Sequence, residues 1–157
     1  MNCSLSLHRR QMGVWALLAL AGAARAQSVD ATLPAATVLR EALAAALKKK
    51  QPLVVMVSLE GCPYCRVARQ SYLAPMHKSG VEVVQLDMNS PQSVQDFAGQ
   101  ATTHGQLIRH WRVSVAPTVL FFGPNGKEVA ERLEGASLPD FYGAYLEQRL
   151  EKGRQSL

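Results

Sequence analysis

Cys62 and Cys65 are the residues of this chain whose type and spacing best support chemistry. Two thiols separated only by Pro63 and Tyr64 can form and break one local disulfide. They follow a short apolar run that is typical of a buried strand, and they precede a pattern that is typical of a helix. A Cys-x-x-Cys pair at such a turn indicates a redox site. We therefore predict a Cys62–Cys65 disulfide that exchanges with thiols of another molecule.

The place of Cys62 before the predicted helix makes it the candidate nucleophile. Unpaired backbone N–H groups and the helix dipole favour an anion at that end, and the thiolate is the attacking form of cysteine. Cys65 lies one turn further along and is expected to be more buried. Its role would be to resolve the mixed disulfide and release the substrate. A passive disulfide, or half of a metal site, is the alternative for this pair.

Residues 1–26 have the features of a secretory signal peptide. A basic segment at residues 8–10 precedes an apolar stretch over 12–24, and residues 24–26, Ala-Arg-Ala, form a small-x-small cleavage site. The apolar stretch is shorter than the ~20 residues of a membrane-spanning helix. We therefore expect secretion and no stable membrane insertion after cleavage, with a retained membrane anchor as the alternative.

Cleavage of this segment changes the thiol inventory and the charge. Cys3 is lost, so Cys62 and Cys65 become the only cysteines. The net charge falls from +5 to +2, because three arginines and no acidic residues are lost. The remaining charge gathers only at Lys48–Lys50, which we expect to be the solvated end of a helix. This mild charge gives no reason to predict nucleic-acid binding.

The elements that position the thiols alternate between helix and strand. We predict helices over 36–50, 63–75, 93–98, 105–111 and 138–151, and strands over 53–57, 81–87, 119–122 and 128–133. Pro75 is expected to kink or end the second helix, and residues 123–126 form a hairpin turn. Residues 27–35 are predicted to be a flexible leader, and 36–157 a single domain. This order indicates an α/β sandwich, parallel first and antiparallel at the end.

The sequence resembles the thioredoxin-fold proteins in four motifs. They are Cys62-Pro63-Tyr64-Cys65 at a strand-to-helix turn, Val115-Ala116-Pro117-Thr118 at the start of a later strand, the hairpin segment Phe121–Val129, and Leu133-Glu134-Gly135-Ala136 before the last helix. Together they span nearly the whole chain that follows the signal. The resemblance implies a three-layer α/β/α sandwich with a central mixed sheet of four to five strands.

The resemblance also implies which residues meet the substrate. It places a cis peptide bond before Pro117, which would bring residues 115–118 beside the thiols. Ala116, Pro117, Thr118 and Gly135 are then expected to bind substrate, with the backbone of Ala116 pairing to an extended segment as in strand addition. An ordinary trans proline at the start of a strand is the alternative.

Two positions near the thiols depart from the thioredoxin pattern. Six positions before the first cysteine, where the family has a buried acid, this chain has Met56. Directly before that cysteine, where the family has Trp, it has Gly61. Glu60 is the nearest acid, and with Pro63 and Tyr64 it is expected to tune the redox potential. A solvated Glu60, with water as the proton acceptor, is the alternative.

Other charged residues carry less specific predictions. Arg66 and Arg69 lie on the helix after the thiols, where they form a solvated face or else add positive potential and guide an acidic partner. His77, His104 and His110 match no compact metal-ligand spacing. We therefore predict no metal and place these histidines at the surface or at helix ends.

The resemblance implies a periplasmic thiol-disulfide oxidoreductase without a cofactor, acting on protein disulfides or dithiols. We favour the role of reductant, since the segment 89–106 is too short for the helical insertion of related oxidants. A membrane-embedded thiol-disulfide carrier is the expected redox partner. Pro-Tyr between the cysteines is typical of glutaredoxins, but the double glycine of that family is absent. A glutathione-dependent enzyme and a non-enzymatic module that binds a metal or a partner are the alternatives.

Overall fold

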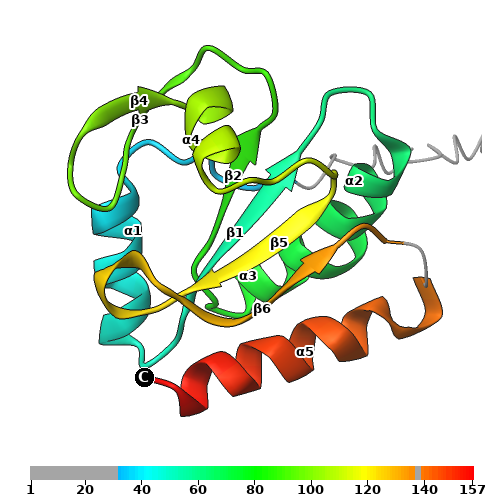
Figure 1. The fold of residues 1–157 in the computed structure, drawn as a ribbon. Helices are drawn as coiled ribbons and strands as arrows, with labels where there is room; N and C mark the ends of the chain where they lie inside the picture. The colour runs from blue at the N-terminus through cyan, green and yellow to red at the C-terminus, as the bar shows by residue number, and fades with distance from the viewer. Residues whose placement is uncertain (1–31, 137–138) are drawn as a thin grey trace, which may run out of the picture.

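The central sheet of the molecule has four strands (Figure 1). The computed structural model describes residues 32–136 and 139–157, so the predicted signal peptide lies outside the described residues. The strands are β1 (Leu53–Ser58), β2 (Val83–Asp87), β5 (Thr118–Phe122) and β6 (Glu128–Glu134), in the order β2-β1-β5-β6. β1 is parallel to β2, while β5 is antiparallel to both β1 and β6. The predicted mixed sheet is confirmed.

β1 lies between β2 and β5, and all of its residues are buried. A continuous apolar run of this kind is expected for a strand that is covered on both faces. Val54 and Met56 face a cluster that contains Cys65, while Val55 and Val57 face a second cluster on the other side. Each face of the sheet therefore carries its own core.

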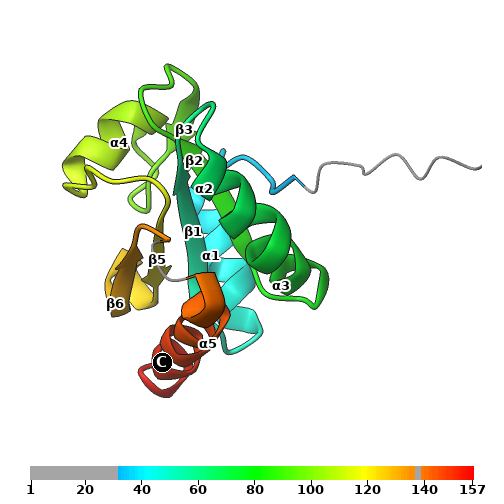
Figure 2. The same ribbon diagram turned by 90° about the vertical axis from the view of Figure 1, so that its right-hand side faces the viewer.

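Helices cover both faces and complete the predicted three layers. One cluster is covered by α1 (Leu39–Lys48) and α4 (His104–His110), the other by the long α5 (Pro139–Gln155) and the helical segment after the cysteines. Figure 2 shows α4 on the opposite side of the strands from α2 and α3. The thiols thus begin a helix that packs directly on the central strand.

Pro75 was expected to kink or end the helix after the cysteines; the helical segment does not end there but continues to Lys78. It runs as α2 (Pro63–Val67), a π-helical segment (Ala68–Leu73) and α3 (Ala74–Lys78). A proline within a regular helix loses one hydrogen bond and crowds the preceding turn. Here the π-helical turn comes just before it, so Pro75 lies at the start of α3, where a missing N–H costs little.

The predicted helix over 93–98 is wrong, because this segment contributes to a small second sheet. β3 (Ser93–Gln95) pairs antiparallel with β4 (Ala101–Thr103). Asp96 forms the turn between them by accepting hydrogen bonds from the N–H groups of Ala98 and Gln100, at 2.9 and 2.8 Å. Asp side chains favour turns for this reason, and here the turn prevails over the helix.

Part of the predicted flexible leader belongs to the folded body. Ala36 N–H donates to the Gln85 carbonyl at 2.8 Å, and Gln85 N–H donates to the Pro34 carbonyl at 2.9 Å. Leu33 and Ala36 are buried. These residues cover the free edge of β2, which would otherwise expose unpaired backbone groups to pairing with another chain. The leader prediction therefore fails for residues 33–35, and residues 27–31 lie outside the described part of the chain.

His104 connects this edge segment to the rest of the domain. It is the first residue of α4, as a helix-end position predicts, but it is fully buried rather than at the surface. Its Nε2 lies 2.9 Å from the Ala36 carbonyl oxygen, and its Nδ1 accepts from Asp87 N–H at 3.2 Å. One imidazole thereby holds the edge segment and β2 together.

We expect His104→Leu to reduce the free energy of unfolding by roughly 2–4 kcal/mol, because a buried backbone group without a partner costs about 1–3 kcal/mol. Urea denaturation measures this loss. The matched control is His110→Leu on the exposed part of the same helix, which should stay within about 0.5 kcal/mol of wild type. Equal effects of the two changes would show that the buried bridge contributes nothing.

Candidate active site

The site is built on the turn between β1 and α2, where Cys62 and Cys65 form a disulfide. Their Cα atoms are 5.3 Å apart, within the usual range for such a bond. Cys62 is the N-cap residue of α2, and the backbone N–H of Cys65 donates to its Sγ at 3.1 Å. Gly61, with φ of +73°, allows the sharp turn that precedes them.

The two sulfurs differ in access. Cys65 is fully buried in the cluster beneath α2, whereas Cys62 is only partly buried. An incoming molecule can therefore reach the Cys62 side of the disulfide and not the Cys65 side. This is the asymmetry that the positions along the helix predict.

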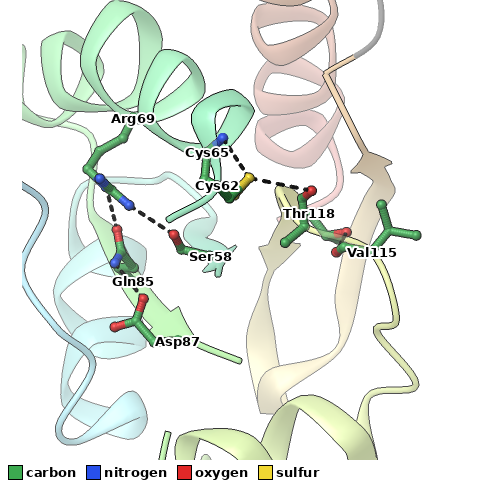
Figure 3. The surroundings of a disulfide bond; sticks show 9 residues. Ser58, Cys62, Cys65, Arg69, Gln85, Asp87, Val115 and Thr118 are labelled. Atoms are coloured by element: carbon green, nitrogen blue, oxygen red, sulfur yellow. Dashed lines mark hydrogen bonds between the residues drawn. A yellow bond between two sulfur atoms is a disulfide. The ribbon is translucent and has the colours of Figure 1, made fainter. Parts of the chain in front are cut away.

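The loop before β5 lies on one side of the disulfide (Figure 3). The Ala116–Pro117 peptide bond is cis, as expected, and the Ala116 carbonyl oxygen lies 3.9 Å from Cys62 Sγ. Gly135 N–H donates to the Pro117 carbonyl at 2.7 Å. The structure thus brings Ala116 beside Cys62 and joins Gly135 to the neighbouring Pro117.

Thr118 does not present its side chain to a substrate. It is fully buried, and its hydroxyl donates to the Val115 carbonyl at 2.7 Å. The prediction that Thr118 binds substrate is therefore corrected: its side chain shapes the loop that holds Ala116. A motif shared with a family shows which residues adjoin a site, but not which way each side chain points.

The residues expected to tune the potential lie around the same turn. Glu60 and Pro63 line a groove beside Cys62, and Glu60 is exposed. Tyr64 is 62% exposed. Met56 is fully buried in the cluster that contains Cys65. An apolar thioether therefore occupies the position at which the family has an acid.

Tyr142 on α5 is a buried polar residue that the sequence did not single out. It belongs to the same cluster as Cys65, and its ring centroid is 5.2 Å from that of Tyr72. Burial, together with the neighbouring Tyr72, raises the pKa of Tyr142 well above its ordinary value. The phenol is therefore neutral at physiological pH and adds no charge behind the cysteines.

A groove of about 950 Å³ lies on the other side of Cys62 and contains Arg69. Arg69 Nε donates to Gln85 Oε1 and its Nη2 donates to Ser58 Oγ, both at 2.8 Å. The solvated helix face predicted for Arg69 is thus wrong, while Arg66 is exposed as expected. The sequence missed this contact because the partners of Arg69 lie on β1 and β2, far from it in sequence.

The chain matches a known protein family over most of its length. A family model described as a thioredoxin-like domain matches residues 39–150. A thioredoxin from Thermus thermophilus is 25% identical, with a TM-score of 0.53, over 78% of this chain and 91% of that chain. Among the curated proteins none matches the chain.

Two further structures share the fold at lower identity. A thioredoxin-fold protein from Helicobacter pylori is 16% identical, with a TM-score of 0.53, over 68% of this chain and 73% of that chain. Oxidised mitochondrial thioredoxin 3 from Saccharomyces cerevisiae is 17% identical, with a TM-score of 0.51, over 76% of this chain and 93% of that chain. Both support the assignment of the fold.

Proposed function

Since this chain belongs to the thioredoxin-like family, we propose that it reduces the disulfides of protein substrates through Cys62 and Cys65. The fold and the Cys-x-x-Cys pair make it a thiol-disulfide oxidoreductase. The observation that carries the proposal is the partly buried Cys62 at the N-cap of α2, 3.9 Å from the Ala116 carbonyl, with Cys65 buried behind it. Cys62 is accordingly the nucleophile and Cys65 the resolving thiol.

The reaction begins with the reduced protein. The Cys62 thiolate is stabilised by the Cys65 N–H, which points at Sγ, and by the N-terminal end of the helix. It attacks one sulfur of the substrate disulfide, and that bond breaks as the mixed disulfide forms. The other substrate sulfur leaves with the bonding electrons as a thiolate and takes a proton from water.

Resolution follows within the protein. Cys65 loses its proton and attacks Cys62 Sγ, so the mixed disulfide breaks and the second substrate sulfur leaves as a thiolate. Two electrons have then passed from the dithiol to the substrate, and the protein holds the disulfide shown in Figure 3. Because Met56 cannot accept a proton, we propose that water, or the exposed Glu60 through water, accepts the Cys65 proton.

The loop at Ala116 supports a mode of substrate binding. Its carbonyl faces the attacking sulfur, and Pro117 behind it is buried. We propose that an extended substrate segment pairs with the Ala116 backbone, which would align a substrate sulfur with Cys62. Gly135, bonded to the Pro117 carbonyl, supports the loop from the neighbouring strand.

We also propose export to the periplasm and renewal of the dithiol by a membrane-embedded thiol-disulfide carrier. The support for export is the signal pattern of residues 1–26. Over residues 32–136 and 139–157, no helix combines the length and apolar character needed to cross a membrane. The carrier is inferred from the need for an electron source in an oxidising compartment.

Two measurements on the purified protein test the function and its direction. With dithiothreitol as electron donor, we expect the protein to accelerate insulin reduction. Titration against a redox buffer should give a reduction potential nearer to about −270 mV, as in reducing dithiol proteins, than to about −120 mV, as in strong oxidants. A potential near the oxidising end, without insulin reduction, would reverse the proposed direction.

A further inference from the structure

We propose that the groove on the Arg69 side of Cys62 binds a carboxylate of the substrate, and that Arg69 is a specificity-determining residue. We call this site the Arg69 groove and define it by Ser58, Cys62, Arg66, Arg69 and Gln85, all of which line it. The inference rests on the proposed function, since it concerns the disulfide substrate that reacts at Cys62.

The Arg69 groove and the Ala116 loop flank the disulfide on opposite sides. Figure 3 shows Arg69, Ser58 and Gln85 on one side and the loop from Val115 to Thr118 on the other. Cys62 borders both, because its Sγ lies 3.9 Å from the Ala116 carbonyl and the residue also lines the groove. A substrate attached at Cys62 and paired with the loop therefore extends its other side toward the groove.

The guanidinium of Arg69 is held in place before any substrate arrives. Its hydrogen bonds to Ser58 and Gln85 go to neutral oxygen atoms, one through Nε and one through Nη2. A guanidinium has five N–H donors, so these bonds occupy only part of the group. Because the side chain is already oriented, binding a carboxylate would require little further ordering.

The charge of Arg69 is not neutralised by an ion pair within the described residues. Ion pairs there involve Lys49, Arg132, Arg149 and Arg154, and none involves Arg69. Asp87 also lines the groove, but its Oδ1 accepts from Gln85 Nε2 at 2.8 Å, so Gln85 lies between the two charges. Arg66 adds a second, exposed cation at the same groove.

The acidic residues of the groove cancel its net positive charge, so charge alone does not select the ligand. Glu60 and Asp87 balance the formal charges of Arg66 and Arg69, so the groove has no strong overall attraction for anions. Recognition must come from the directed donors of Arg69, which suit the planar oxygens of a carboxylate. We infer a substrate with one carboxylate close to its reactive sulfur, such as a Glu beside the cysteine.

Arg69 is placed to contact the substrate rather than to activate the thiol. Its guanidinium points toward Ser58 and Gln85, whereas Cys62 Sγ points toward the Ala116 loop (Figure 3). Within the described residues, no hydrogen bond joins Arg69 to either sulfur. The two roles therefore predict different kinetics. Loss of thiol activation would slow every substrate alike, whereas loss of a substrate contact would slow only the substrates that carry the carboxylate.

Matched peptide disulfides test the proposal. Two peptides differ only in Glu or Gln next to the cysteine, and stopped-flow kinetics follow oxidation of the reduced full-length protein. Wild type should oxidise roughly tenfold faster with the Glu peptide, as expected for one charge-assisted hydrogen bond. Arg69→Gln should abolish that preference. Arg109→Gln, an exposed change on α4 outside the groove, is the control.

The outcomes separate this inference from the function on which it rests. Equal rates for both peptides with wild type, or an equal slowing of both in Arg69→Gln, would overturn carboxylate recognition. Failure to react with either peptide would instead contradict the proposed function. If Arg69→Gln does not fold, Arg69→Lys gives a second test, because lysine keeps the charge but not the planar, directed donors, so the preference should fall severalfold.

A second experiment with small disulfides distinguishes a carboxylate on a protein substrate from one on a low-molecular-weight disulfide. Dithiodiglycolate and its uncharged diamide replace the two peptides in the same assay. A preference for the charged form only among peptides assigns the groove to protein substrates. A preference in both assays shows that the groove also accepts low-molecular-weight disulfides, whereas a preference only among the small disulfides overturns recognition of a carboxylate on a protein substrate.

Discussion

Cys62→Ser should lose disulfide exchange completely, whereas Cys65→Ser should still attack its substrate and then stop. A serine hydroxyl is not ionised at neutral pH and forms no disulfide, so no mixed intermediate can form without Cys62. In Cys65→Ser the accessible sulfur remains at the N-cap of α2, and only the resolving thiol is lost. We therefore expect a mixed disulfide to accumulate on Cys62.

Insulin reduction measures the first effect, and intact-protein mass spectrometry the second. Cys62→Ser should fall to the uncatalysed rate, and Cys65→Ser should gain the mass of one substrate chain in a form that dithiothreitol removes. The buried position of Cys65 makes it a poor target for a protein substrate. Normal insulin reduction by Cys62→Ser would refute the central assignment, and trapping through Cys65 in that variant would exchange the two roles.

Phe121→Ala should cost the domain about 3–5 kcal/mol of unfolding free energy, as large-to-small changes at buried aromatic residues do. Phe121 lies on β5, is fully buried and packs in the cluster that contains Cys65. Domains of this kind are stable by only about 5–15 kcal/mol. The variant should therefore lose much of its stability, and with it the platform beneath the disulfide.

The chain offers a matched control for this change. Phe141 on α5 is 61% exposed, so Phe141→Ala removes the same atoms without opening a buried cavity. Urea denaturation should place Phe141→Ala within about 0.5 kcal/mol of wild type. Similar midpoints for the two variants would mean that the cluster around Phe121 is not the core of the domain.

The sequence predicted the site where the signals were local. A continuous apolar run, then two cysteines around a proline that suits the first helical turn, is sufficient to place Cys62 and Cys65 between β1 and α2. The order of strands and helices, and the hairpin before α5, also followed from periodicity and turn residues. Each of these patterns extends over only a few neighbouring residues.

The errors arose where distant contacts prevailed over local preference. Residues 93–98 were predicted to be helical, but the Asp96 turn and the pairing with β4 favour a strand. His104 lies at a helix end, one of its two predicted places, but the sequence did not predict that Asp87 and Ala36 use both of its ring nitrogens in the interior. No pattern of neighbouring residues indicates partners so far away.

By itself, the sequence determined the chemistry of this protein and the elements that carry it. Residue type decides what a thiol can do, and short-range backbone preferences decide where strands and helices form. Only the tertiary structure decided that the Ala116 carbonyl lies 3.9 Å from Cys62 Sγ and that Arg69 reaches Ser58 and Gln85. Those features depend on packing between segments that meet only when the sheet has assembled, so they were absent from any local pattern around Cys62 and Cys65.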